Sequence, residues 1–190
     1  MKKLVIGTFA ALFLLVGCGQ KKETAASTTE SSQEALQSTL PVLENATKNT
    51  VVTKTLVLPA DESGAQQTQI ITYKGNQFLS LTIQQKRPVS EDLKNYISER
   101  GLDEAKKVLK EAEDKDESVQ AARKISGFTI ETTLLNEKEM ETKTSYDFQT
   151  LDLKKASENE YLKNVGLENL LKNEPEDYIA NRVANGATVQ

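Results

Sequence analysis

Apolar and polar side chains alternate with a period of two in the stretches 68–73 and 77–85, and partly so in 51–59, which is rich in β-branched residues. Such alternation is typical of β-strands that bury one face. Gly75 and Asn76 separate the second stretch from the third, and both residue types suit the tight turn of a β-hairpin. The pattern therefore predicts three strands, of which the last two form a hairpin.

From Ser90 to Ala112 the apolar residues recur at the spacing of an α-helix. Ser90 can cap the first turn, and two acids follow it where the helix dipole favours negative charge. Gly101 interrupts the pattern and predicts a kink or a break into two helices. The stretch 113–118 is charged and solvated, and the helix is expected to run on toward Ala122.

The period of two returns over residues 128–134 and 140–148, with a hairpin turn between them. The tail, 158–186, predicts two short helices divided near Pro175. The fold class that follows is α+β: an antiparallel β-sheet of about five strands, packed on one face by helices and preceded by a disordered tether.

The first 17 residues have the pattern of a secretory signal peptide. Lys2 and Lys3 precede an apolar run over 4–16, which is shorter than the roughly 20 residues that a membrane-spanning helix needs. The chain therefore predicts export rather than a transmembrane anchor.

The tetrapeptide Leu15-Val16-Gly17-Cys18 resembles the bacterial lipobox, and Cys18 is the only cysteine of the chain. The resemblance implies a diacylglyceryl group on the Cys18 thiol and cleavage directly before that residue. The alternative is an ordinary secreted protein with a chance cysteine near its cleavage site. Two or more acyl chains give stable attachment, whereas one chain binds only reversibly.

The segment 19–40 is rich in Ser, Thr, Ala, Gln and Glu and has no aromatic residue, so it predicts a flexible tether. We expect three parts: the signal peptide 1–17, the lipidated cysteine with its tether 18–50, and one α+β domain over 51–190. The tether would give the domain a reach of roughly 30 Å.

Charge bears on the partners of the protein. The formal net charge is −4, which argues against nucleic acid, because phosphate binding needs a basic patch. It also argues against electrostatic adhesion to anionic lipid. The lipid anchor is then the expected membrane contact, at the extracytoplasmic face of the cell membrane.

The composition excludes several chemistries. The chain has no His, and its one Cys is assigned to the lipid, so nucleophiles paired with His and the usual zinc or copper ligand sets are absent. We expect no cofactor and no metal. The acids around 114–118 could suggest a calcium loop, but Val119 stands where that loop needs Gly, so a solvated helix face or helix end is favoured.

Paired carboxylates remain as a possible acid–base system, with Asp147 and Asp152 after one strand and Glu139 and Glu141 at its start. The alternative is that Asp147 and Asp152 only cap a turn and stay solvated. For Tyr73 and Tyr146, the favoured interpretation is a place at the rim of the core. A second interpretation puts both on a common sheet face, where they line a ligand groove.

Three motifs carry a family resemblance: Tyr73-Lys74-Gly75 at the hairpin, Ile125-Ser126-Gly127 before a strand, and `DFQTLDL` over 147–153. With the lipobox, these resemble the YehR-like family of small bacterial lipoproteins over about residues 68–186. The resemblance implies an envelope-anchored α+β domain and brings no catalytic residues with it.

The leading functional hypothesis is a non-enzymatic binding or interaction module of the cell envelope, whose partner is an envelope protein, a peptide or a small ligand. The first alternative is a structural or protective lipoprotein that masks a surface factor. The second is a carboxylate-based hydrolase. A binding module needs a concave, partly apolar surface with convergent polar groups, which distinguishes it from a masking protein.

Overall fold

The computed structural model describes residues 49–190. The lipobox residues Leu15, Val16, Gly17 and Cys18, and almost all of the predicted tether, lie outside the described residues. Within 49–190, no helix has both the length and the apolar character needed to cross a membrane.

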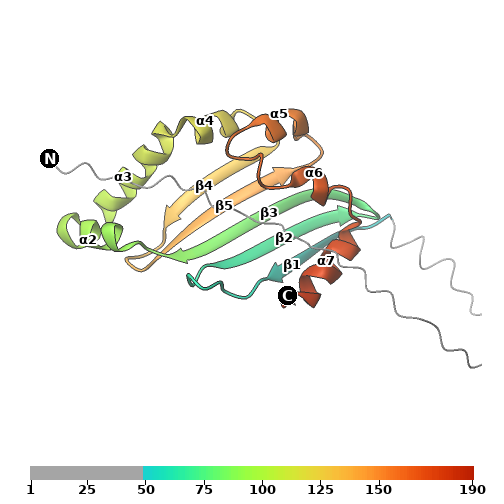
Figure 1. The fold of residues 1–190 in the computed structure, drawn as a ribbon, viewed down its shortest axis with the longest axis horizontal. Helices are drawn as coiled ribbons and strands as arrows, with labels where there is room; N and C mark the ends of the chain where they lie inside the picture. Colours follow the sequence, from blue (N-terminus) through green and yellow to red (C-terminus); the bar gives the residue numbers. More distant parts are fainter. Residues whose placement is uncertain (1–48) are drawn as a thin grey trace, which may run out of the picture.

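One antiparallel sheet, ordered β4-β5-β3-β2-β1-β6, forms the centre of the domain (Figure 1). Its strands are β1 (Val51–Val57), β2 (Gln66–Lys74), β3 (Gln77–Pro88), β4 (Phe128–Leu134), β5 (Glu139–Asp147) and β6 (Thr188–Val189). The predicted α+β class and antiparallel sheet are confirmed. The short β6, which pairs with Leu56 and Val57, is the one strand beyond the five predicted.

Six helices are described, α2 (Glu91–Arg100), α3 (Leu102–Lys115), α4 (Glu117–Arg123), α5 (Leu153–Glu158), α6 (Leu167–Leu170) and α7 (Pro175–Ala184). Figure 1 shows α2, α3 and α4 along the β4 side of the sheet, and α5, α6 and α7 toward the end where β2 turns into β3. The buried strand positions alternate with exposed ones, as a sheet with helices on one face requires.

Local signals explain the ends of the first helices. Ser90 Oγ accepts a hydrogen bond from Leu93 N at 3.4 Å, which caps α2 as predicted. Gly101 divides α2 from α3 with a φ of 85° and a ψ of 161°, a conformation open essentially to glycine alone. The predicted break into two helices is confirmed.

One helix prediction was wrong, and one helix was missed. The helix expected to run toward Ala122 ends at Lys115, because Asp116 takes an extended conformation and caps a separate helix, α4. The tail over 158–186 holds two short helices, α6 and α7, divided at Pro175 as predicted, whereas α5 before it was not predicted. Asp152 caps α5, and Pro175 occupies the first turn of α7, where its missing N–H costs nothing.

Buried apolar side chains on the helix-covered face form two clusters. The small cluster lies under α2 and α3 and consists of Val89, Leu93, Ile97, Ala105, Leu109, Leu134 and Met140. The large cluster lies under the other helices and includes Leu56, Ile71, Leu81, Phe128, Tyr146, Leu162, Leu170 and Ile179. The candidate site lies at one end of the large cluster.

Candidate functional site

The turn between β2 and β3 is fastened to the start of α7. Gly75 takes a φ of 55°, as the predicted two-residue turn requires of its first position. Asn76 Nδ2 donates a hydrogen bond to Glu174 Oε1 at 2.8 Å, and the Tyr73 hydroxyl donates one to Glu176 Oε1. These two side-chain bonds hold the hairpin and the helix in one arrangement.

A second turn, at the end of β5, packs beside the first. Asp147 N donates to Gly127 O at 2.7 Å, and Leu151 N donates to Asp147 O at 2.8 Å. Gly127 has a φ of 77°, and a Cβ there would lie 2.6 Å from Leu151 N. The fold therefore brings the Ile125-Ser126-Gly127 motif against the 147–153 motif, and only glycine permits that approach.

The carboxylates of Asp147 and Asp152 are used in local capping. Asp147 accepts from Gln149 N at 3.0 Å and from Thr150 Oγ1 at 2.9 Å. Asp152 Oδ1 accepts from Lys155 N at 3.1 Å, and this bond, with the Lys155 side chain, lowers the pKa of the Asp152 carboxyl. The structure thus agrees with the turn-capping interpretation of both residues.

A hollow of about 420 Å³ opens between the two turns. Its apolar lining residues are Phe78, Leu79, Phe148 and Leu171, and its polar ones are Asn76, Gln77 and Gln149. The hollow draws on β3, the turn after β5 and the loop before α7, which are far apart in the sequence. None of the described residues that line it carries a charge.

Aromatic rings in mutual contact form the wall of the hollow. The Phe78 ring lies edge-on to Phe148, with centroids 6.2 Å apart, and edge-on to Tyr178, with centroids 5.9 Å apart. The Phe148 ring stacks on Tyr146 with centroids 6.4 Å apart and an interplanar angle of 10°. Because each ring is supported by others, this wall is preorganised.

Tyr73 and Tyr146 share the helix-covered face of the sheet, as one interpretation of the sequence predicted. Tyr73 pairs with Phe78, and Tyr146 pairs with Leu81 on the other side of β3. Both side chains are core residues, 3% and 0% exposed. Burial, followed by the bond to Glu176, raises the pKa of Tyr73 to about 12. The groove predicted at these residues stays a prediction; Phe78 and Phe148 beside them line the hollow.

Polar side chains pair at two places among the helices and strands. Glu113 Oε2 lies 3.0 Å from Arg123 Nη2, and Thr132 Oγ1 donates to Glu113 Oε1 at 3.0 Å. Beside the large cluster, the Tyr178 hydroxyl donates to Gln69 Oε1 at 2.8 Å. Gln69 is fully buried and the other four residues are half-buried, so these bonds replace hydrogen bonds to water that the side chains lose on folding.

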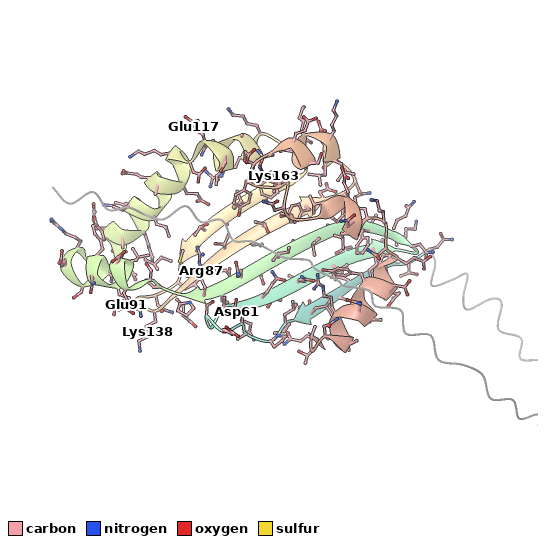
Figure 2. All side chains as sticks on the ribbon, viewed as in Figure 1. Asp61, Arg87, Glu91, Glu117, Lys138 and Lys163 are labelled. Atoms are coloured by element: carbon pink, nitrogen blue, oxygen red, sulfur yellow. The ribbon has the colours of Figure 1, made fainter. Side chains whose placement is uncertain are left out.

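Arg87, labelled in Figure 2, is a charged residue of β3 near Tyr161. Burial lowers the pKa of its guanidinium, and the Tyr161 hydroxyl acts in the opposite direction. Burial also raises the pKa of Tyr161 to about 12. Both groups therefore keep their usual charge state at neutral pH.

The acids near residue 116 serve helix ends, as the favoured interpretation predicted. Asp116 Oδ1 accepts from Ser118 N at 2.9 Å and from Val119 N at 3.2 Å. Asp114 Oδ1 lies 2.8 Å from Arg123 Nη1. Among the residues that the structure describes, no group of three or more His, Cys, Asp or Glu side chains could hold a metal ion.

A second hollow lies between α5 and α6, but its volume is only about 160 Å³. Binding sites for small molecules usually measure roughly 300–1,000 Å³. The hollow of about 420 Å³ between the two turns, called the hairpin-end hollow from here on, is therefore the stronger candidate. Sequence reasoning did not identify it, because the alternation along β3 groups Leu79 with Leu81 and Ile83. A register shift opposite Thr72 and Tyr73 buries Phe78 in place of Leu79, and nothing in the sequence indicates that Phe148 and Leu171 lie beside it.

Comparison with known proteins gives a family and two solved structures. A family model, described only as "-like", matches residues 51–182. The NMR structure of a protein from Streptococcus pneumoniae TIGR4 is similar, with 62% sequence identity and a TM-score of 0.70, and the match covers 87% of this chain and 100% of that chain.

The NMR structure of the Escherichia coli YehR protein is also similar, with 16% identity and a TM-score of 0.48 over 74% of this chain and 91% of that chain. YehR is thus among the similar structures, in line with the resemblance seen in the sequence, but a likeness at this level carries no inference about the site. No curated protein matches the chain.

Proposed function

This chain belongs to the family whose model matches residues 51–182, and we propose one role for this domain together with the segment that precedes it. The protein is a non-enzymatic binding domain, held by a lipid on Cys18 at the extracytoplasmic face of the cell membrane. Its binding surface is the hairpin-end hollow.

The anchor rests on the order of signals at the start of the chain. A basic start, an apolar run, the Leu15-Val16-Gly17-Cys18 tetrapeptide and a polar segment follow one another. A thiol is the chemical group that the lipid-transfer step requires, and this chain offers a single one.

The anchor is tested by Cys18→Ala in the full chain. We expect the variant to leave the membrane fraction and to lose the mass of the acyl chains, as measured by fractionation and mass spectrometry. Gln20→Ala, which leaves the tetrapeptide intact, is the matched control and should stay in the membrane. Membrane retention of Cys18→Ala would contradict the anchor.

The binding role rests on the hollow. Its volume of about 420 Å³ falls within the usual range for ligand sites, and it combines apolar walls with amide groups that donate and accept hydrogen bonds. A masking protein has no need of such a surface. The non-enzymatic part of the proposal is supported by the lining, which offers no carboxylate, thiol or hydroxyl side chain.

Site-specific photocrosslinking in living cells tests the binding role. A lysine analogue with a diazirine on its flexible, unbranched side chain replaces Gln149 at the hollow in one variant, where it can lie along the mouth without filling the hollow. The same residue replaces Thr129, exposed on the other face of the sheet, in the control. We expect a discrete crosslinked species from position 149 and none from position 129. Equal crosslinking from both positions would favour the masking role, and no crosslinking from position 149 would contradict the binding role.

A further inference from the structure

We infer that the occupant of the hairpin-end hollow is an extended peptide segment, which inserts one bulky apolar side chain and places a Lys or Arg beside it, facing the start of α7. This inference rests on the proposed binding role and adds the chemical class of the ligand. Three features of the hollow support it: the apolar recess, the free amides and the acidic rim.

The recess suits an apolar side chain better than a sugar ring. Sugars bind to aromatic residues by stacking on an open ring face, whereas the two phenylalanines here are engaged with other rings. Phe148 stacks on Tyr146, and Phe78 is 7% exposed between Phe148 and Tyr178. What remains accessible is a recess between ring edges and the aliphatic side chains of Leu79 and Leu171. Burying an aliphatic or aromatic side chain there removes apolar surface from water on both partners.

The amides at the mouth of the hollow suit a peptide backbone. Gln77 and Gln149 are exposed, and their side chains make no hydrogen bond with any other described residue. Asn76 gives its Nδ2 to Glu174 but keeps its Oδ1 for an acceptor role. Each free amide can donate to a backbone carbonyl and accept from a backbone N–H, which an extended peptide presents in alternation.

The negative charge beside the hollow favours a peptide with a Lys or Arg next to the inserted side chain. Glu174, Glu176 and Asp177 cluster at the start of α7, which follows the lining residue Leu171. Glu174 and Glu176 hold the hairpin, whereas Asp177 is exposed and makes no hydrogen bond or ion pair within the part of the chain that the structure describes.

Three cations lie near this cluster of acids: Lys74, Lys172 and Arg182. The ammonium of Lys172 is turned to Asn169 Oδ1 at 3.4 Å, and the guanidinium of Arg182 lies over the Tyr178 ring, 4.9 Å from its centroid. The exposed carboxylate of Asp177 forms an ion pair with none of them. A Lys or Arg next to the inserted side chain is therefore attracted to Asp177, and an acidic neighbour is repelled.

The test is selection from a random dodecapeptide phage library on the full chain in mild detergent. We expect the enriched peptides to share a Leu, Ile, Phe or Trp with a Lys or Arg within two positions. The peptide of the consensus sequence is then synthesised, and its dissociation constant is measured by fluorescence anisotropy.

Variants of the protein locate the binding. Gln149→Trp fills the hollow and is expected to weaken peptide binding by at least about tenfold. Asp177→Lys reverses an exposed charge beside the hollow and is expected to weaken binding by about twofold to fivefold. The matched controls are Thr129→Trp and Glu131→Lys, which make the same kinds of change on the exposed face of β4 and should leave the affinity unchanged. Circular dichroism and thermal unfolding show that each variant is folded.

Two results would overturn the inference. One is a selection that enriches no peptides, or enriches peptides without the apolar–basic pair. The other is peptide binding that Gln149→Trp leaves unchanged. The crosslinking experiment separates this failure from that of the proposed function. If position 149 crosslinks specifically to a glycan or a lipid, the binding role stands and the peptide inference falls. If position 149 crosslinks to nothing, the binding role itself falls.

Discussion

The two apolar clusters on the helix-covered face are built from different parts of the chain. The small cluster takes most of its members from one continuous stretch, 89–109, and adds Leu134 and Met140 from the β4–β5 hairpin. The large cluster takes members from Leu56 through Ala187 and contains the interlocked aromatic rings. The first depends mainly on local contacts, and the second joins the beginning and the end of the domain.

The boundary between the clusters coincides with the helix break at Asp116. Ala105 and Leu109 of α3 belong to the small cluster, whereas Val119 and Ala122 of α4 belong to the large one. The break lets the chain change direction and serve both. From this difference we expect that α2 and α3 can unfold locally while the large cluster, which supports the hollow, stays folded.

The largest expected effect is on the free energy of unfolding, and it distinguishes two glycine-to-alanine variants, one on each side of this boundary. Gly127→Ala adds a Cβ that meets the backbone of Leu151 and Asp147 at 2.6 to 2.7 Å, in a residue with positive φ. We expect a loss of about 4 kcal/mol or more in the free energy of unfolding, because both strain and a backbone clash oppose the native state. Urea unfolding followed by circular dichroism measures it.

Gly101→Ala is the matched control. Its φ of 85° is as unfavourable, but nothing lies within 4 Å of the added Cβ, so strain alone should cost about 1–3 kcal/mol. Equal losses for the two variants would show that the packing of Gly127 against the 147–151 turn contributes nothing.

The next effect compares two fully buried leucines. Leu81→Ala in the large cluster should cost about 3–5 kcal/mol, and Leu134→Ala in the small cluster about 2–3 kcal/mol. Hydrogen exchange distinguishes them further. Leu134→Ala should speed exchange in α2 and α3 while leaving β2 and α7 protected, whereas Leu81→Ala should speed exchange throughout. Uniform acceleration in Leu134→Ala would contradict the separability of the two clusters.

The smallest effect concerns the boundary itself. Asp116→Ala removes the cap of α4 and should cost about 1 kcal/mol at pH 7. The hydrogen bond from the Ser118 hydroxyl is the main cause that lowers the pKa of Asp116 in the folded state. The contribution of this carboxylate is therefore present above the unfolded-state pKa of about 4, and it is lost as the pH falls through the lower folded-state value.

Asp116→Asn is its control, because Asn also caps helices but does not titrate. At pH 7, Asp116→Asn should recover only part of the stability that Asp116→Ala loses, as measured by thermal unfolding, because its amide oxygen accepts the cap hydrogen bonds without the charge. Near pH 2, Asp116→Ala should lose its deficit relative to the unmodified chain. A deficit that stays constant between these pH values would show that the charged cap has no special role.

Much of the fold follows from short-range patterns in the sequence. Alternation identified β1 to β5, and Gly75 and Gly101 marked the turn and the helix break, because each of these signals acts within a few residues. β6 has only two residues and no period to detect. The end of α3 was missed because Asp116 is surrounded by residues that favour a helix, and the cap prevails once α4 packs on the large cluster.

The candidate site was less predictable. The shared face of Tyr73 and Tyr146 could be inferred from strand alternation. The hollow could not, since Phe78, Phe148 and Leu171 meet only through the strand order and the 147–151 turn. Contacts between distant segments leave no periodic signal in a single sequence.

The register of β1 has a mechanical consequence. β1 begins at Val51, which pairs with Lys74 at the last position of β2, directly before the turn that carries Asn76. A pulling force between a ligand in the hollow and a lipid at the start of the chain would enter and leave the domain at the same end of the sheet. The load would cross only the start of β1 and the hairpin, so the small apolar cluster under α2 and α3 would remain unstressed.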